Sequence, residues 1–220
     1  MNIVYRFETP EYSGNILYVN VVPKYKCVNE CGFCSRQDAI AGKPNIYEKK
    51  TGCSLYLPRK PTIDEVMREI DREIKQDDEE IAIIGLGEPL IYLPTVTEVL
   101  NVVNKRYKIN TRVDTNGLVG CMYDDSIQRL EDVGLSKVSI SLNAINQQDY
   151  DKLCKPRFDN AWKKLIEAIE ECVVSSIDTH TSFVVNFEPM DEQELIDFAV
   201  SLGVDVDNVH LRDYVLPSSQ

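Results

Sequence analysis

Three closely spaced cysteines are the residues of this chain best suited to chemistry. Cys27, Cys31 and Cys34 form a C-x3-C-x2-C pattern, and they follow an apolar run at residues 16–22 that predicts a strand. Cysteine thiolates are ligands for zinc and for iron–sulfur clusters. Three thiolates on one short loop can hold an inorganic centre from one side, so the rest of the sequence must supply whatever completes the site.

Two other chemistries fit part of this pattern. A structural zinc site normally has four protein ligands, and the nearest fourth cysteine, Cys53, lies on a long connection with no histidine close by. A thiol–disulfide redox site needs a C-x2-C pair, which Cys31 and Cys34 supply, but Cys27 then has no role. Burial is the simplest interpretation of the scattered cysteines Cys121, Cys154 and Cys172.

The composition is that of an ordinary globular protein. The 220 residues, 43% of them apolar, suffice for one domain with a sizeable core. The net charge of −12 argues against a nucleic-acid partner, because such surfaces are usually basic. No apolar run approaches the ~20 residues that span a bilayer, and the N-terminus lacks the features of a signal peptide. We therefore expect a cytoplasmic protein without membrane contact, whose seven cysteines serve as ligands, catalysts or buried thiols.

Apolar residues alternate between helical and strand periodicity along the chain. Helical stripes, the first opened by the capping-box pair Thr62 and Glu65, predict helices at residues 62–76, 94–105, 124–133, 159–174 and 191–202. Short apolar runs predict six strands, at residues 15–22, 81–84, 109–114, 137–142, 179–187 and 208–215. Residues 1–14 are expected to form an edge strand or hairpin arm. Residues 35–61 form a long connection without periodicity, which in a compact domain is usually functional.

This alternation implies parallel strands joined by right-handed crossovers. Periodicity alone fits both a doubly wound open sheet and an incomplete barrel. In either architecture ligands bind at the carboxyl ends of the strands. The sequence places there the cysteine loop, the turn at residues 85–89, and the polar residues Asn116, Ser139, Ser141, Asn143, Asn186, Glu188, His210 and Arg212.

The order of these pieces resembles the radical S-adenosylmethionine (SAM) superfamily. Its members carry a C-x3-C-x2-C loop after the first strand and a Gly-Gly-Glu-Pro-like turn after the second. More narrowly, the chain is similar to the TatD-associated radical SAM proteins over roughly residues 15–215. The stretches that carry this likeness are Gly85-Leu86-Gly87-Glu88-Pro89, Arg112-Val113-Asp114-Thr115-Asn116-Gly117-Leu118, Val138-Ser139-Ile140-Ser141-Leu142-Asn143-Ala144 and Leu153-Cys154-Lys155-Pro156-Arg157-Phe158.

The resemblance implies an α/β fold, a partial (β/α)6 TIM-like barrel with parallel strands, in a single radical SAM domain over residues 1–220. It implies a [4Fe-4S] cluster on Cys27, Cys31 and Cys34. Most such clusters take four cysteines, so here one iron is left for the amine and carboxylate of SAM. The other implied SAM contacts are Phe33 near the adenine, Gly87, Glu88 and Pro89 at the methionyl amine, Asn116 at the adjoining rim, Ser141 and Asn143 at the ribose or carboxylate, and, by strand position, Asn186 and Arg212. Leu86 stands where many members have glycine.

The implied reaction is reductive. An external one-electron donor, flavodoxin-like or ferredoxin-like, reduces the cluster; SAM is cleaved to methionine and a 5′-deoxyadenosyl radical, which abstracts hydrogen from a substrate. Neither the substrate, which could be a peptide, a protein or a small molecule, nor a catalytic residue follows from the sequence. The alternative function is a non-catalytic, zinc-stabilised interaction domain that partners a TatD-like metallohydrolase. Visible absorption separates the two hypotheses, because a zinc protein is colourless.

Overall fold

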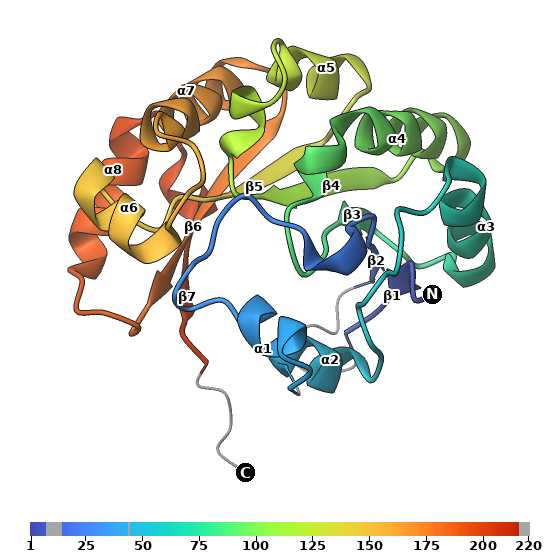
Figure 1. Ribbon diagram of the computed structural model, residues 1–220. Helices are drawn as coiled ribbons and strands as arrows, with labels where there is room; N and C mark the ends of the chain where they lie inside the picture. The colour runs from blue at the N-terminus through green and yellow to red at the C-terminus, as the bar shows by residue number, and fades with distance from the viewer. Residues whose placement is uncertain (8–14, 44, 216–220) are drawn as a thin grey trace.

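A curled sheet of seven strands forms the centre of the computed structural model, which describes residues 1–7, 15–43 and 45–215 (Figure 1). A short strand, β1 (Val4–Tyr5), runs antiparallel to β2 (Ile16–Val19). The others continue in parallel from β2: β3 (Glu80–Ile83), β4 (Asn110–Thr115), β5 (Lys137–Ser141), β6 (Asp178–Val185) and β7 (Val209–Asp213). The six predicted strands are confirmed, and β1 is the expected N-terminal edge strand. The rest of that arm, residues 8–14, lies outside the described residues.

The order of the strands decides between the two architectures. The strands lie side by side in chain order from β1 to β7. A doubly wound sheet reverses direction at a switch point, whereas here each parallel connection moves the chain one strand further in the same direction. The sheet curls as it goes, and most of its helices lie on the convex side (Figure 1). The fold is therefore a partial, TIM-like (β/α)6 barrel.

Five predicted helices are present, with ends that differ from the expected ones by a few residues. They are α3 (Ile63–Glu73), α4 (Leu93–Tyr107), α5 (Ser126–Asp132), α7 (Ala161–Val174) and α8 (Glu192–Ser201). The capping box of Thr62 and Glu65 is formed at the start of α3. The main core lies between these helices and the convex face of the sheet, and it includes Leu17, Ile81, Val113, Ile140 and Phe183. No helix among the described residues is long and apolar enough to cross a bilayer.

Three short helices were not predicted: α1 (Arg36–Ile40), α2 (Ile46–Thr51) and α6 (Gln147–Cys154). They have few apolar residues per turn, and two of them begin at asparagine N-caps, Asn45 and Asn146, whose side chains accept a backbone N–H from the first turn. The first predicted parallel strand was too long and ends at Val19. The buried Asn20 amide accepts the Val22 N–H and donates to the carbonyl of Leu55, which turns the chain.

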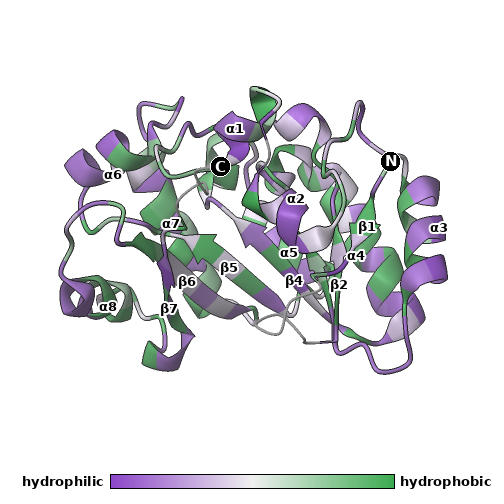
Figure 2. Ribbon diagram, turned by 90° about the horizontal axis from the view of Figure 1, so that it is seen from below, coloured by the Kyte–Doolittle hydropathy of each residue, from purple (hydrophilic) through white to green (hydrophobic). Residues whose placement is uncertain are grey.

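The concave face of the sheet has two unlike halves. Over β2 and β3 it is covered by a small apolar core, in which Tyr18 and Ala82 pack against Leu55 of the long connection. The helices of that connection, α1 and α2, lie on the concave side, while β5 and β6 remain in view beside them (Figure 2). Over β4 to β7 the concave face carries charged and polar side chains.

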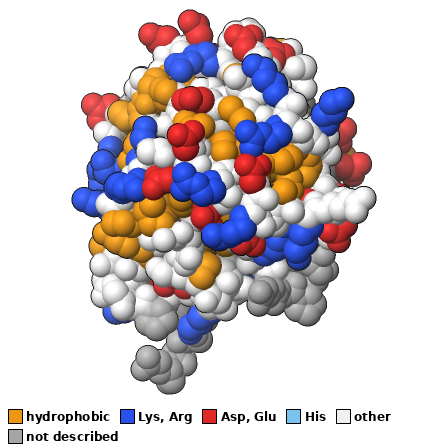
Figure 3. All heavy atoms as spheres, turned by 90° about the vertical axis from the view of Figure 1, so that its right-hand side faces the viewer, with side chains coloured by type: hydrophobic (Ala, Val, Ile, Leu, Met, Phe, Trp, Pro, Cys, Tyr) orange, Lys and Arg blue, Asp and Glu red, His pale blue; other side chains and the backbone are white. Residues whose placement is uncertain are grey.

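The outer face around α3 is different again. Acidic and basic side chains lie next to one another there, with apolar residues between them (Figure 3). The charges pair locally, as Arg72 does with Glu69 and Arg106 with Asp71. Exposed pairs of this kind contribute little to stability, and this face is a solvated surface with no bearing on the candidate site.

Candidate functional site

The cysteine loop leaves β2 through the 3-10 turn η2 (Pro23–Tyr25) and crosses the carboxyl ends of the strands (Figure 1). Its backbone pairs with the end of α6, far along the chain. The Glu30 N–H donates to the carbonyl of Cys154 at 3.0 Å, and the Gly32 N–H donates to the carbonyl of Leu153 at 2.9 Å. The loop is thus held by main-chain bonds on both sides of Cys31.

A buried arginine ties the loop together from inside. Arg36, 6% exposed, donates from Nη1 to the carbonyl of Tyr25 at 3.2 Å and from Nη2 to the carbonyl of Asn29 at 2.7 Å. Hydrogen bonds from a charged donor are stronger than neutral ones. The guanidinium therefore fixes the carbonyls that flank Cys27.

The thiols of Cys27, Cys31 and Cys34 are protonated when no metal is bound. Burial raises the pKa of Cys27 to about 12 and also raises the pKa of Cys34. The pKa of Cys31 is raised first by a hydrogen bond with the thiol of Cys154 and then by burial. The positive charge of Arg36 opposes all three shifts. Metal binding must release these protons, and Arg36 reduces the free energy that this requires.

The Gly-Leu-Gly-Glu-Pro turn after β3 rests directly on the cysteine loop. The Glu88 N–H donates to the carbonyl of Lys26 at 2.9 Å. Gly87 has a φ of +149°, and a Cβ at this position would lie 2.4 Å from the same carbonyl oxygen, so a glycine is required. Leu86, at the position where the family resemblance implies a glycine, packs in the small core with Leu55. Leu86 thus faces the small core and leaves the contact at Gly87 intact.

Glu88 is a buried carboxyl that joins two strand ends. Its Oε1 accepts the Leu90 N–H at 2.9 Å and the Thr115 hydroxyl at 2.8 Å, while Oε2 accepts the Asn116 N–H at 2.7 Å. Burial raises the pKa of Glu88 to about 7 despite these three bonds. With both oxygens engaged, the side chain holds the turn in place, and the turn's backbone is what remains to face a ligand. Pro89 begins the 3-10 turn η3 (Pro89–Tyr92) and is buried.

Asn116 connects the end of β4 to the cysteine loop. Its Oδ1 accepts the Leu118 N–H at 3.0 Å, and its Nδ2 donates to the sulfur of Cys27 at 3.7 Å. The same sulfur also accepts the Asn29 N–H at 3.4 Å. The structure therefore brings the predicted residue Asn116 to a predicted ligand, at a distance acceptable for sulfur acceptors.

Ser141 and Asn143, both implied as SAM contacts, have different environments. Ser141 ends β5 and is half-buried on the concave side. Asn143 lies beyond the strand with φ of +60°, and is 3% exposed. Its Oδ1 accepts the Val184 N–H at 3.1 Å and its Nδ2 contacts the sulfur of Cys154. The left-handed backbone of Asn143 turns its side chain into the protein, so Asn143 is less accessible to SAM than Ser141.

Aromatic residues line the rim near the third cysteine. Phe33 packs edge-on against Phe187, with ring centroids 5.8 Å apart, and Phe187 packs in turn against Tyr214 at 4.9 Å. A Cβ on Gly32 would lie 3.2 Å from the Phe187 ring. These contacts leave Phe33 half-buried, as a ring that is to stack on a base would need to be.

The two residues placed only by strand position are less closely tied to the loop. Asn186, exposed with φ of +62°, donates its side-chain amide to Asp213. Arg212 is exposed, and its charge acts on Asp114 and His210 across the concave face. Neither residue forms a hydrogen bond or an ion pair with the cysteine loop in the described part of the chain.

Sequence reasoning missed two residues that shape the site, Arg36 and Phe187, and gave Cys154 no contact with the cysteine loop. Arg36 lies two positions after Cys34, but a lone arginine gives no signal of burial. Cys154 was interpreted as a scattered buried thiol, and it is indeed fully buried. Its contact with Cys31, however, arises from the pairing of α6 with the loop, which no local pattern encodes.

The donor set fits an iron–sulfur cluster. The three loop cysteines are free thiols of intermediate exposure, with N–H donors to one sulfur and a buried cation beside all three. Among the described residues no three His, Cys, Asp or Glu side chains are placed to hold a single metal ion. Each thiolate of a [4Fe-4S] cluster binds a different iron, so the sulfurs need not meet at one point.

Comparison with solved structures supports the same fold. Streptococcus suis SuiB bound to S-adenosylmethionine matches 94% of this chain and 43% of its own, with a TM-score of 0.64 and 16% identity. The methyltransferase TsrM from Kitasatospora setae, with cobalamin and a [4Fe-4S] cluster bound, matches 89% of this chain and 36% of its own, with a TM-score of 0.56 and 11% identity. At these identities the likeness shows the fold.

Two curated proteins match this chain in sequence. The GTP 3′,8-cyclase of Clostridium perfringens (strain SM101) is 22% identical over 188 residues, which is 85% of this chain and 52% of that protein. A probable dual-specificity RNA methyltransferase RlmN of Microcystis aeruginosa is 27% identical over 158 residues, 71% of this chain and 42% of that protein. The chain spans about half the length of the curated relatives it matches. Residues 21–199 match the family described as the Radical SAM superfamily, and the chain belongs to that superfamily, whose members use a [4Fe-4S] cluster and SAM.

Proposed function

We propose that this chain forms the catalytic core of a radical SAM enzyme. The observation that carries the proposal is the cysteine loop itself: three free thiols, tied by Arg36 and seated against the glycine contact at Gly87. Cys27, Cys31 and Cys34 would hold the cluster. The chemistry that a bound cluster and SAM supply is reductive cleavage of the sulfonium, followed by hydrogen abstraction from a substrate.

The residues around the loop have distinct proposed tasks. Asn116 and the Asn29 N–H donate to the Cys27 sulfur and stabilise it as a thiolate. The backbone of Gly87 and Pro89, held by the Glu88 carboxyl, binds the methionyl amine. Phe33 provides a surface for the adenine, and the Ser141 hydroxyl is available to the ribose.

For three of the implied SAM contacts, Asn143, Asn186 and Arg212, the structure favours a less direct role. Asn143 would support the site without touching SAM, because its side-chain amide hydrogen-bonds within the protein. Asn186 and Arg212 remain candidates at the outer rim, where Arg212 would attract the methionyl carboxylate. In these roles the protein orients the cofactor and excludes water, and the exclusion protects a reactive species from side reactions.

A one-electron donor, flavodoxin-like or ferredoxin-like, would dock beside the cysteine loop. Residues 24–60 carry eight Lys or Arg and only three Asp or Glu, in a chain whose net charge is −12. A donor with an acidic surface would complement this segment and associate faster at low salt. We therefore expect the rate at which the donor reduces the cluster to fall as ionic strength rises.

The narrower grouping with TatD-associated proteins is also a proposal. Two stretches that carry it have structural roles here: residues 112–118 include the Arg112–Asp114 pair and Asn116, and residues 153–158 pair with the cysteine loop. A TatD-like hydrolase is accordingly a proposed partner, and a cytoplasmic location is proposed with it. The named relatives act on unlike substrates, so a substrate cannot be inherited from them.

Anaerobic reconstitution tests the proposed function. The chain should bind about four irons, become brown, and form 5′-deoxyadenosine from SAM under dithionite. Cys121→Ser, at a half-exposed cysteine of the 3-10 turn η4 (Leu118–Cys121), is the matched control and should behave like the natural chain. A colourless protein with one zinc and no 5′-deoxyadenosine would instead support the zinc-stabilised interaction domain.

A further inference from the structure

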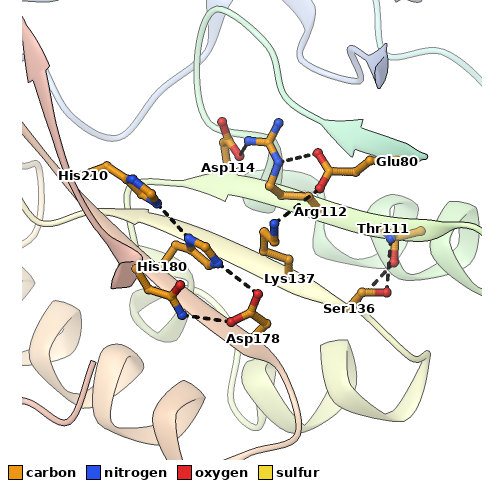
Figure 4. Close-up of polar contacts among 10 residues, drawn as sticks. Glu80, Thr111, Arg112, Asp114, Ser136, Lys137, Asp178, His180 and His210 are labelled. Carbon is orange, nitrogen blue, oxygen red and sulfur yellow. Dashed lines mark hydrogen bonds and ion pairs between the residues drawn. The ribbon is translucent and has the colours of Figure 1, made fainter. Parts of the chain in front are cut away.

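A row of charged and polar side chains covers the concave face over β4 to β7 (Figure 4). Cross-strand partners share a face of a sheet. In the observed register Arg112 pairs with Lys137, His180 lies beside Ser139, and His210 lies beside Ser182. All of these lie inside the curl of the sheet, on the side opposite α4, α5, α7 and α8. No step of the proposed function uses them.

The carboxylates of this row are already paired with neighbouring side chains. Glu80 accepts the Arg112 Nε at 2.7 Å, and Asp114 pairs with the same guanidinium. Asp178 accepts His180 Nε2 at 2.9 Å and the Asn208 amide at 3.0 Å. Each negative charge therefore has a close partner.

The positive charges are less fully paired. The nearest carboxylate to Lys137 Nζ is Glu80 at 3.8 Å, and that oxygen's neighbour is bound by Arg112. Arg212 is exposed and makes no ion pair within the described residues. Lys137 and Arg212 are thus the two described cations of this face without a close carboxylate, although over the whole face three cations balance the three carboxylates of the row.

The two histidines are hydrogen-bonded to each other. His180 Nδ1 lies 2.8 Å from His210 Nε2, and the rings stack with an interplanar angle of 9°. A carboxylate only accepts, so His180 carries its hydrogen on Nε2, toward Asp178. Neutral His180 then accepts from His210 Nε2–H, which leaves His210 Nδ1 as an acceptor. The pair holds at most one extra proton, because two would place N–H groups face to face.

The surroundings of His210 disfavour that extra proton. Burial lowers the pKa of His210, and the charges of His180, Lys137, Arg212 and Arg112 lower it further. The charged and titratable groups that face the pair are Glu80 on β3, Arg112 and Asp114 on β4, Lys137 on β5, Asp178 on β6 and Arg212 on β7. An anion bound beside Lys137 would bring a further negative charge close to the pair and favour that proton.

We propose that Lys137 and the His180–His210 pair bind an anionic group of the substrate, a carboxylate or a phosphate, and that the pair takes up one proton as the anion binds. This inference rests on the proposed function and narrows its substrate class. His210 lies three residues before the end of β7, about 10 Å below the rim where the reaction is proposed to occur. A fitting substrate therefore carries its anionic group about 10 Å from the reacting carbon.

Nuclear magnetic resonance of the full chain, without cluster, tests the proposal. The chain has two histidines, so two imidazoles appear in a long-range ¹H–¹⁵N spectrum. Inorganic sulfate is the probe, because its charge is constant from pH 5.5 to pH 8. We expect the pair to take up one proton with a midpoint below the ordinary histidine value, and sulfate to raise that midpoint. By linkage, sulfate should bind about tenfold or more tightly at pH 5.5 than at pH 8.

Matched variants separate an anion site from a structural network. Lys137→Met should weaken sulfate binding at pH 5.5 by about tenfold, whereas Lys163→Met, at an exposed lysine on α7, should not change it. A parallel titration with acetate identifies the anionic group. If sulfate shifts the histidine signals at the lower concentration, the group is a phosphate; if acetate does, it is a carboxylate. Equal sulfate affinity at both pH values, two independent protonations, or identical behaviour of the two lysine variants would overturn the proposal. Iron content and 5′-deoxyadenosine formation are measured separately, so failure here leaves the proposed function standing.

Discussion

Two regions of this barrel differ in how their polar groups are paired. One is the carboxyl rim, formed by the cysteine loop and the turns after β3 and β4; the other is the concave floor, the inner face over β4 to β7. At the rim, buried polar groups satisfy one another: Glu88 uses both oxygens, and Arg36 caps two carbonyls. On the floor, side chains are half-exposed, and Lys137 has only a distant partner. A rim that must hold a cluster in one geometry benefits from rigidity. A floor that must receive a substrate needs donors that are still free. Substitutions at the rim should therefore affect stability and cofactor binding, and substitutions on the floor should affect ligand binding.

The largest effect should come from Gly87→Ala. Its Cβ would lie 2.4 Å from the Lys26 carbonyl oxygen, in a backbone conformation that alanine avoids. We expect a loss of roughly 3 kcal/mol or more in the free energy of unfolding, measured by urea denaturation. Gly42→Ala, at φ of +71° with nothing described within 4 Å, should lose only about 1 kcal/mol. Equal losses would mean that the turn does not rest on the loop.

Arg36→Met should come next. The change keeps the volume but leaves the carbonyls of Tyr25 and Asn29 without their donor and removes the cation beside the thiols. We expect iron to be bound about 10–100-fold more weakly, measured by competition with a chelator. Arg59→Met removes an exposed arginine of the same connection and serves as the control. If both variants bind iron equally, Arg36 has no part in holding the loop.

Glu88→Gln should remove a pH dependence. The native carboxyl keeps its proton up to about pH 7, whereas the unfolded one loses it near pH 4.5. The folded state binds more protons in this window, so stability should fall as pH rises from 4.5 to 7, by about 3 kcal/mol. Gln does not titrate, so the difference between the two unfolding curves should change across this window. Glu170→Gln, on the exposed side of α7, should show no such change.

The smallest effect on stability should be that of His210→Asn. Because the pKa of His210 is lowered in the folded chain, the unfolded state binds more protons just below pH 6.5, and stability falls as pH drops through that region. The variant should lose this part of the fall while remaining folded at pH 8. Thermal midpoints at pH 5.5 and pH 8 measure it. A drop at pH 8 as large as that of Gly87→Ala would show that the floor is as rigid as the rim.

Local sequence patterns were enough for the parallel strands and for much of the rim. The cysteine spacing, the glycine turn and Asn116 each lie next to a strand end in sequence, so periodicity places them. Contacts between distant segments were not accessible in this way. The pairing of the loop with residues 153–157 and the meeting of His180 with His210 depend on the register of the sheet. The short helix α6 was missed for the same reason, since its packing and caps stabilise it more than its propensity does.

The central claim is that three thiols, and not four, hold the cluster, so that one iron is open to SAM. Cys154 makes this testable, because its thiol contacts Cys31 and could serve as a fourth ligand. The decisive measurement is iron content and 5′-deoxyadenosine formation for single alanine variants of Cys27, Cys31, Cys34 and Cys154. The account predicts that the first three lose both properties and that Cys154→Ala keeps about four irons and forms 5′-deoxyadenosine. Loss of the cluster in Cys154→Ala, with a fold intact by circular dichroism, would contradict it.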